Sequence, residues 1–232
     1  MPAESRAQNI PFLLVIEGID GAGKTTLAAS IAAEMRRCGI AVAASKEPTQ
    51  GKFGQQLRQT AATGRIAPRE ELALLLLDRR EHIENLVGPA LQERSIVILD
   101  RYYFSNAAYQ GSEGLDPEAI IEMNETFAPR ADLVLLLDVP PSVGLSRISF
   151  RGDLANQFEK PDTLAVCRSI FNSMNRPEIR KIDATMSADR VFAVALELFV
   201  VAYVEKARQV FGMTPAAVEA IRPLLHGAYA TA

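Results

Sequence analysis

The sequence of 232 residues has no tryptophan, only two cysteines and two histidines, and no excess of basic residues. Cys38 and Cys167 are isolated from each other and from histidine, which argues against a disulfide framework or a zinc site and is typical of a reducing compartment. The formal net charge of −3 offers little to a nucleic-acid backbone, so we expect no nucleic-acid partner.

Long hydrophobic segments are also missing. The longest apolar stretch, residues 191–204, is interrupted by Glu197 and is shorter than the ~20 residues that a bilayer span requires. The polar residues 1–10 contain no apolar core of a signal peptide. We therefore expect a cytoplasmic protein without membrane contact.

The composition is that of an ordinary globular protein. Apolar residues make up 48% and charged residues 23%, which excludes a disordered chain. The glycines and prolines follow no period, so collagen-like and low-complexity classes are excluded as well. Because α/β folds reach about 250 residues as one unit, and no linker is evident, we expect residues 1–232 to form a single domain.

Short, continuously apolar segments alternate with helical patterns. The expected strands are residues 12–16, 40–44, 95–99, 133–137 and 179–182, and the expected helices include 25–37, one beginning at Pro68, one capped by Asp116, 142–150, 163–174, one from about 187 and a terminal one within 207–232. Strands that are apolar on both sides are typical of a parallel sheet covered on both faces.

The strongest motif is G-x-x-x-x-G-K-T, which lies between an expected strand and an expected helix. In such a loop, backbone N–H groups surround phosphate oxygens, the lysine contacts the β- and γ-phosphates, and the threonine hydroxyl binds Mg²⁺. The expected ATP-binding residues are Gly18, Ile19, Asp20, Gly21, Ala22, Gly23, Lys24, Thr25 and Thr26. With this loop, the strand pattern predicts a P-loop NTPase fold of three αβα layers, with a five-stranded parallel sheet and helices on both faces.

Other charged residues lie where phosphoryl transfer needs them. Asp100 ends an expected strand, where P-loop proteins place a carboxylate for Mg²⁺, so we expect Thr25 and Asp100 to bind the metal. Arg147 and Arg151 are one helical turn apart and lead into a glycine-containing segment. We expect a mobile lid at about residues 151–158, whose arginines reach the transferring phosphoryl group. The guanine-reading Asn-Lys-x-Asp motif of GTPase switches is absent.

With these pieces, the chain resembles the thymidylate kinases, which convert dTMP to dTDP. The resemblance covers residues 12–198 and rests on ordered motifs: Glu17–Thr26, Lys46-Glu-Pro-Thr49, Gly54–Arg58, Asp78-Arg-Arg-Glu-His82, Asp100-Arg-Tyr102, Ser105-Asn-Ala-Ala-Tyr-Gln-Gly111, Leu137–Pro141 and Phe158-Glu159. The block from Asp100 to Gly111 is the most specific of these motifs.

The resemblance implies a role for each matched residue. Arg58, Arg79 and Arg101 would converge on the 5′-phosphate of the acceptor, Asp20 would hold its 3′-hydroxyl or order Mg²⁺, and Asn106 would contact the pyrimidine. The other implied acceptor residues are Glu47, Pro48, Leu75, Tyr109, Gln110 and Glu159. The loop 183–186, with Ala184, would hold the adenine of ATP. The catalytic set is then Lys24, Asp20, Arg101, Arg147 and Arg151, the cofactor is Mg²⁺ with ATP as donor, and the assembly is a homodimer.

Some positions depart from the family pattern. Leu75 stands where the family usually has a phenylalanine stacked on thymine, and Lys46 stands where arginine is usual. Neither His82 nor His226 is placed for catalysis. Two alternatives stay open: a deoxynucleoside kinase, in which Glu47 would be the base toward a sugar hydroxyl, and a non-catalytic ATP sensor that kept the fold.

Overall fold

A computed structural model describes residues 10–63, 66–151 and 160–211. Five strands form one parallel sheet in the order β2-β3-β1-β4-β5. Their bounds are Phe12–Glu17 for β1, Val42–Lys46 for β2, Ile96–Asp100 for β3, Leu133–Asp138 for β4 and Ile179–Asp183 for β5. The predicted α/β fold with a five-stranded parallel sheet is confirmed, and each strand lies within two residues of its expected position.

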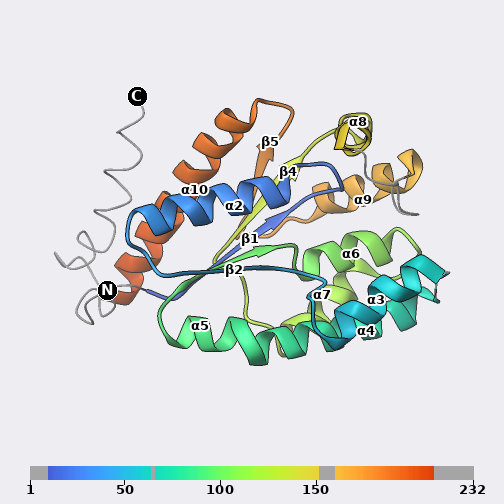
Figure 1. The fold of residues 1–232 in the computed structure, drawn as a ribbon, viewed down its shortest axis with the longest axis horizontal. Coiled ribbons are helices and arrows are strands. Elements are labelled where there is room, and N and C mark those ends of the chain that lie inside the picture. The colour runs from blue at the N-terminus through green and yellow to red at the C-terminus, as the bar shows by residue number, and fades with distance from the viewer. Residues whose placement is uncertain (1–9, 64–65, 152–159, 212–232) are drawn as a thin grey trace.

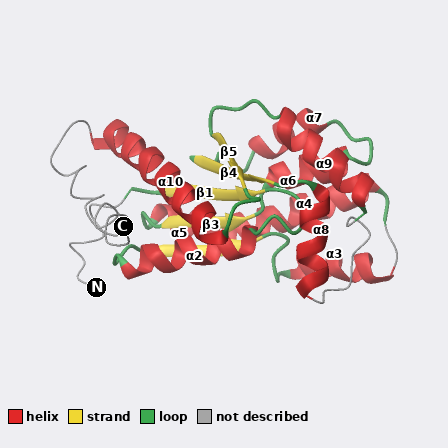
Figure 2. Ribbon diagram, turned by 90° about the horizontal axis from the view of Figure 1, so that it is seen from above, coloured by secondary structure: helices red, strands yellow, loops and turns green. Residues whose placement is uncertain are grey.

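Helices cover both faces of the sheet (Figure 1). Their bounds are α2 Lys24–Arg37, α3 Lys52–Thr63, α4 Pro68–His82, the π-helix η1 Ile83–Val87, α5 Gly88–Gln92, α6 Tyr103–Gly111, α7 Pro117–Glu125, α8 Pro141–Arg151, α9 Pro161–Ser173 and α10 Ala188–Phe211. The helices α2 and α10 lie on one face, and α4, α5 and α6 lie on the other (Figures 1 and 2).

Burial explains the central strands. All residues of β1 and β3 are buried, as are Leu133–Leu137 of β4, so these strands are apolar on both sides. The edge strands β2 and β5 are partly exposed and more polar. The core is continuous from the sheet into α2 and α10. Phe12 of β1 packs edge-on against Phe199 of α10, with ring centroids 5.2 Å apart.

Local signals fix two helix starts. Asp116 caps α7, because its Oδ1 accepts the backbone N–H of Glu118 at 2.9 Å. Pro68 opens α4 with Glu70 and Glu71 in the first turn, where carboxylates interact favourably with the helix dipole. Helix α4 is important for function because it carries Arg79 and His82 toward β2.

Parts of the prediction fall outside the described residues. The expected lid is described only as far as Arg151, where α8 ends, and Glu159 is not described. Of the expected terminal helix, residues 207–211 belong to the end of α10 and the remainder is not described. No helix in the described ranges is both long and apolar enough to cross a membrane.

Candidate active site

The glycine-rich turn follows β1, the middle strand of the sheet. Gly18, Gly21 and Gly23 have φ values of +140°, +78° and +100°, which glycine adopts without strain. A Cβ atom at Gly21 would lie 2.1 Å from the carbonyl oxygen of Gly144 in α8. The loop is therefore in backbone contact with the helix that carries Arg147, and only glycine permits this approach.

Lys24 and Thr25 begin α2 directly after the loop. Lys24 is buried, and its Nζ donates to the carbonyl oxygen of Ile19 at 2.8 Å. Burial, with the nearby charge of Arg101, lowers the pKa of Lys24 to about 8. The Thr25 hydroxyl donates to Oδ2 of Asp100 at the end of β3. These side chains line a cavity of about 220 Å³.

The chemistry of this cavity fits a magnesium ion bound together with phosphates. Oδ1 of Asp100 is buried and makes no hydrogen bond with any residue in the described part of the chain. A carboxylate and a hydroxyl are hard oxygen ligands, which Mg²⁺ prefers, and Mg²⁺ in phosphate sites is usually held by one or two protein groups. Among the described residues, no three His, Cys, Asp or Glu side chains form a metal site on their own.

Asp20 connects the loop to the next two elements. Arg101, which follows β3, donates to Oδ1 of Asp20, and the Tyr109 hydroxyl in α6 donates to Oδ2 at 3.0 Å. The guanidinium also lies 5.1 Å from the centroid of the Tyr109 ring. Burial raises the pKa of Tyr109, which keeps its hydroxyl protonated as a donor. Arg101 has φ +74°, an uncommon conformation for a residue with a side chain.

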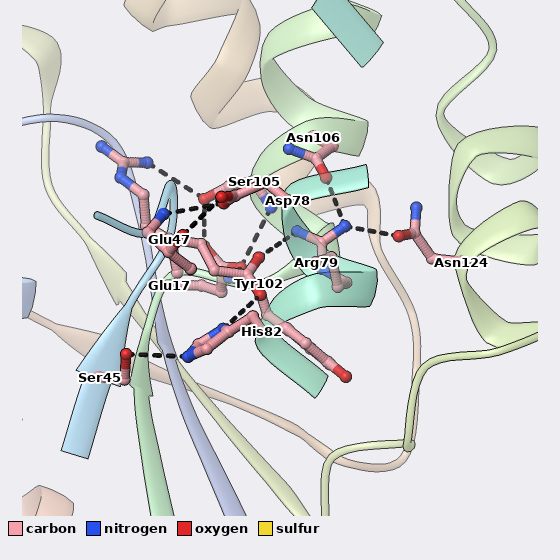
Figure 3. A network of polar contacts seen from close by, with 12 residues as sticks. Glu17, Ser45, Glu47, Asp78, Arg79, His82, Tyr102, Ser105, Asn106 and Asn124 are labelled. Carbon is pink, nitrogen blue, oxygen red and sulfur yellow. Dashed lines mark hydrogen bonds and ion pairs between the residues drawn. The ribbon is translucent and has the colours of Figure 1, made fainter. Parts of the chain in front are cut away.

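Glu17 fixes α6 against the loop. This buried carboxylate ends β1, and its Oε1 accepts the backbone N–H groups of Tyr102 at 2.8 Å and Ser105 at 3.1 Å, while Oε2 accepts the Ser105 hydroxyl at 2.6 Å (Figure 3). Both N–H groups lie at the start of α6, where the helix itself supplies few acceptors, and that of Ser105 also donates to the carbonyl oxygen of Tyr102 at 3.1 Å. Burial nevertheless raises the pKa of Glu17 to about 7.

Arg79 lies in a buried polar network behind the cavity (Figure 3). One of its nitrogens, Nη2, pairs with Oε2 of Glu47, and Nη1 donates to Oδ1 of Asn106 at 2.7 Å and to Oδ1 of Asn124 at 2.5 Å. Burial opposes ionisation of Glu47, but Arg79 and His82 hold the pKa of its carboxyl below the usual range.

The expected convergence of Arg58, Arg79 and Arg101 on one acceptor phosphate stays a prediction, and the structure gives each guanidinium different surroundings. Of the three, Arg101 lines the loop cavity. Arg58 is exposed on α3 and donates to the carbonyl oxygen of Thr49 at 2.6 Å. Arg79 lies on the buried face of α4, where it is engaged by Glu47 and the two asparagines.

A second cavity, of about 410 Å³, lies on the other side of the loop. Arg147 and Ala184 line it with Ala22 and Thr26, and Arg147 Nη2 donates to the carbonyl oxygen of Ala184 at 2.9 Å. The structure thus brings the expected adenine loop, one lid arginine and the phosphate loop together. The side chain of Arg151 lies outside the description.

The remaining expected acceptor residues surround the Arg79 network. Asn106 is in contact with Arg79, and Pro48 follows Glu47 across a cis peptide bond. Gln110 is buried in α6, and its Nε2 donates to Oε2 of Glu71 at 3.2 Å. Leu75 is one turn before Arg79 on α4 and is buried.

Four residues of the site were not in the predicted set. Lys46 lines the loop cavity, and Glu17, His82 and Asn124 join the buried network. Lys46 and Glu17 sit directly beside predicted residues at strand ends, so the strand boundaries could have found them. Asn124 is brought in by the packing of α7 on α6, for which the sequence carries no local signal.

Strand order, phosphate loop and adjoining carboxylate together define a member of the P-loop class of nucleotide-binding proteins, which includes the nucleotide kinases. The family model described as thymidylate kinase matches residues 16–193. A thymidylate kinase of Xylella fastidiosa strain M12 is 53% identical over 187 residues, 81% of this chain and 86% of the relative. One of Xanthomonas campestris pv. campestris strain B100 is 52% identical over 197 residues, 85% of this chain and 86% of the relative.

The chain belongs to the thymidylate kinase family. This membership confirms the resemblance drawn from the motifs, and with it the expectation of an ATP-dependent dTMP kinase. It does not favour a deoxynucleoside kinase or an ATP sensor.

Proposed function

We propose that the enzyme transfers the γ-phosphoryl group of MgATP to dTMP, giving dTDP and ADP, through the residues assembled around Asp20. The observation that carries this proposal is the Asp20–Arg101–Tyr109 cluster next to the phosphate loop. Asp20 and Arg101 line the cavity that we assign to the phosphates, and Glu47 of the buried network lines the same cavity. Two phosphates that repel each other need a fixed positive charge close to both, which the Arg101 guanidinium supplies while Asp20 orients it.

The protein groups act by position and charge. Lys24 now donates to the Ile19 carbonyl and, in the complex, moves to the β- and γ-phosphates. Arg147 faces the donor from α8 and neutralises charge on the transferring group, and Arg151 adds a second cation there. The acceptor phosphate is already ionised at neutral pH, so no side chain needs to act as a nucleophile.

Thr25 and Asp100 would hold Mg²⁺, which supplies charge neutralisation on the donor phosphates when it is bound. The buried, unpaired Oδ1 of Asp100 supports this assignment. Asp100 also orients the Thr25 hydroxyl, which donates to its Oδ2.

Arg79 belongs to the base end of the acceptor site in our proposal, together with Asn106, rather than to its phosphate end. The supporting contacts are its hydrogen bonds to Asn106 and Asn124 and its pairing with Glu47. Arg101, Lys46 and the exposed Arg58 then remain for the 5′-phosphate. Tyr109, Gln110, Pro48 and Leu75 form the walls around sugar and base, and Glu159, which lies outside the described residues, stays a predicted acceptor residue.

Glu47 is a poor candidate for the base that a deoxynucleoside kinase would require. Both of its carboxylate oxygens are engaged, by Arg79 and His82, and its pKa is held low. A carboxylate in this state accepts a proton from a sugar hydroxyl only with difficulty. The monophosphate is therefore the acceptor that we propose.

The experiment is a coupled assay of ADP release with dTMP, dUMP and thymidine as acceptors. We expect turnover with dTMP and none with thymidine. Turnover with thymidine in preference to dTMP, or ATP binding without any turnover, would contradict the proposal. We also propose a cytoplasmic homodimer that binds no nucleic acid, on the basis of the family resemblance and the net charge, and sedimentation of the purified enzyme tests the dimer.

A further inference from the structure

His82 is a buried side chain for which the proposed reaction has no chemical role. It ends α4, one turn beyond Arg79, and its ring lies between Ser45 of β2 and Glu47, which follows β2 (Figure 3). Its Nδ1 is 3.0 Å from Oε1 of Glu47, and its Nε2 is 2.9 Å from the Ser45 hydroxyl. Both ring nitrogens are therefore engaged in a region from which water is largely excluded.

The proton on Nδ1 can be assigned from its partner. Glu47 is ionised, because its Oε2 is paired with the permanently charged guanidinium of Arg79. An ionised carboxylate can only accept hydrogen bonds, so Nδ1 must be the donor. The Ser45 hydroxyl fits Nε2 in either protonation state, since a hydroxyl can donate or accept. The ring orientation is thus fixed from two elements.

This arrangement divides the oxygens of Glu47 between two partners. Oε1 takes the hydrogen bond from His82, which leaves Oε2 directed at Nη2 of Arg79. The other terminal nitrogen of Arg79 is then free to contact Asn106 and Asn124. Without His82, Oε1 would be a buried acceptor with no donor, a state that costs enough free energy to rotate the carboxylate away.

We propose that His82 is a positioning residue for acceptor recognition: it holds the Glu47 carboxylate in the orientation that presents Arg79 and Asn106 to the acceptor base. This inference rests on the proposed function, since it assumes that the buried network binds the acceptor nucleotide. It goes beyond that function because His82 contacts neither substrate, and its effect passes through Glu47 alone.

Two amide variants of His82 distinguish the contribution of Nδ1 from that of Nε2. The amide nitrogen of asparagine occupies roughly the place of Nδ1, and that of glutamine the place of Nε2. H82N therefore keeps the donor to Glu47, whereas H82Q keeps the contact with Ser45 and loses the donor. H82Q should raise the KM for dTMP about tenfold, the usual effect of one hydrogen bond to a charged group, and leave the KM for ATP within about twofold. H82N should restore most of the dTMP affinity.

A merely structural role predicts a different result. The role of His82 would be overturned if H82Q and H82N raised both KM values equally, or if the KM of H82Q for dTMP were unchanged. The proposed function would remain intact in either case, provided that the wild type turns over dTMP. Absence of dTMP turnover in the wild type would overturn both. Should H82Q fail to fold, E47Q keeps the test open: it must raise the dTMP KM with little change for ATP, and an unchanged dTMP KM would refute the proposal.

Discussion

Arg101 binds the carboxylate of Asp20 and so connects the carboxyl end of β3 to the phosphate loop that follows β1. The pair is only partly exposed, and Tyr109 donates to the same carboxylate from α6. Three elements that are distant in the sequence thus meet at one charged pair. Because Arg101 has a positive φ, the backbone itself directs this guanidinium back toward the loop.

If this pair works as a unit, its two members should not contribute independently. D20N and R101K should each lower kcat/KM for dTMP at least tenfold. The fold-loss in kcat/KM of the double variant should be much smaller than the product of the two single fold-losses. The expected coupling is about 1–3 kcal/mol, the range for contacting residues in one network. Y109F serves as control, since it removes one neutral donor and leaves the ion pair. Additive losses in the double-mutant cycle would show that Asp20 and Arg101 act separately.

Most of the fold could be predicted because its signals are local. The apolar strands, Pro68 and the Asp116 cap act within a few residues, and the glycine loop has a fixed form. Helix α6 was not predicted, because Tyr102 precedes it without a side-chain cap. The cap comes instead from Glu17, which accepts the backbone N–H of Tyr102 from 85 residues earlier in the chain. A cap supplied from a distant strand leaves no pattern beside the helix.

The site was predicted less completely for a similar reason. Motifs identified the phosphate loop and Asp100, whose roles follow from their position at strand ends. The direction of the Arg79 guanidinium, however, depends on how α4 packs on β2 and α7, and those contacts are tertiary. Motif order alone could therefore not show that Arg79 lies in this buried network.

Glu17 should make the stability of the protein depend on pH in an unusual direction. Burial raises the pKa of Glu17 to about 7 in the folded protein, whereas in the unfolded chain it is near the ordinary 4.5 of a glutamate. The folded state therefore binds a proton more tightly, and the stability that this provides is complete below pH 4.5 and is lost as the pH rises through 7. The free energy of unfolding of the wild type should fall relative to E17Q over this range by about 1–3 kcal/mol.

Urea unfolding at several pH values between 4.5 and 8 measures this difference. The glutamine side chain keeps an oxygen for the backbone N–H groups of α6 but does not titrate, so it is a suitable reference. Parallel pH curves for the two proteins would show that Glu17 has the same pKa in the folded and unfolded states.

The contact of the phosphate loop with α8 predicts a strong effect of a single methyl group. In G21A, the new Cβ would lie 2.1 Å from the Gly144 carbonyl oxygen, so the loop or α8 must move. Thermal unfolding should show a loss of about 2–4 kcal/mol, and the KM for ATP should rise. G114A is the matched control: its φ of +95° imposes similar strain, but nothing described lies within 4 Å of the new atom. Similar losses for both variants would mean that backbone strain, and not the contact, limits position 21.

Leu75 offers a test of where the acceptor base lies. It is buried one turn before Arg79 on the same face of α4, where the family usually has a phenylalanine. An aromatic ring at this position adds a stacking surface worth roughly 0.5–1.5 kcal/mol. If the base packs against residue 75, L75F should lower the KM for dTMP by about two- to tenfold, while the KM for ATP stays unchanged.

The control for L75F is L75M, which keeps the volume and flexibility of an aliphatic side chain without an aromatic face. Its KM for dTMP should match that of the wild type. Thermal unfolding of both variants shows whether the larger ring strains the core, since overpacking typically costs about 1–3 kcal/mol. A stable L75F whose dTMP KM is the same as that of the wild type would place the base away from α4, and the assignment of Arg79 to the base end of the site would then fail with it.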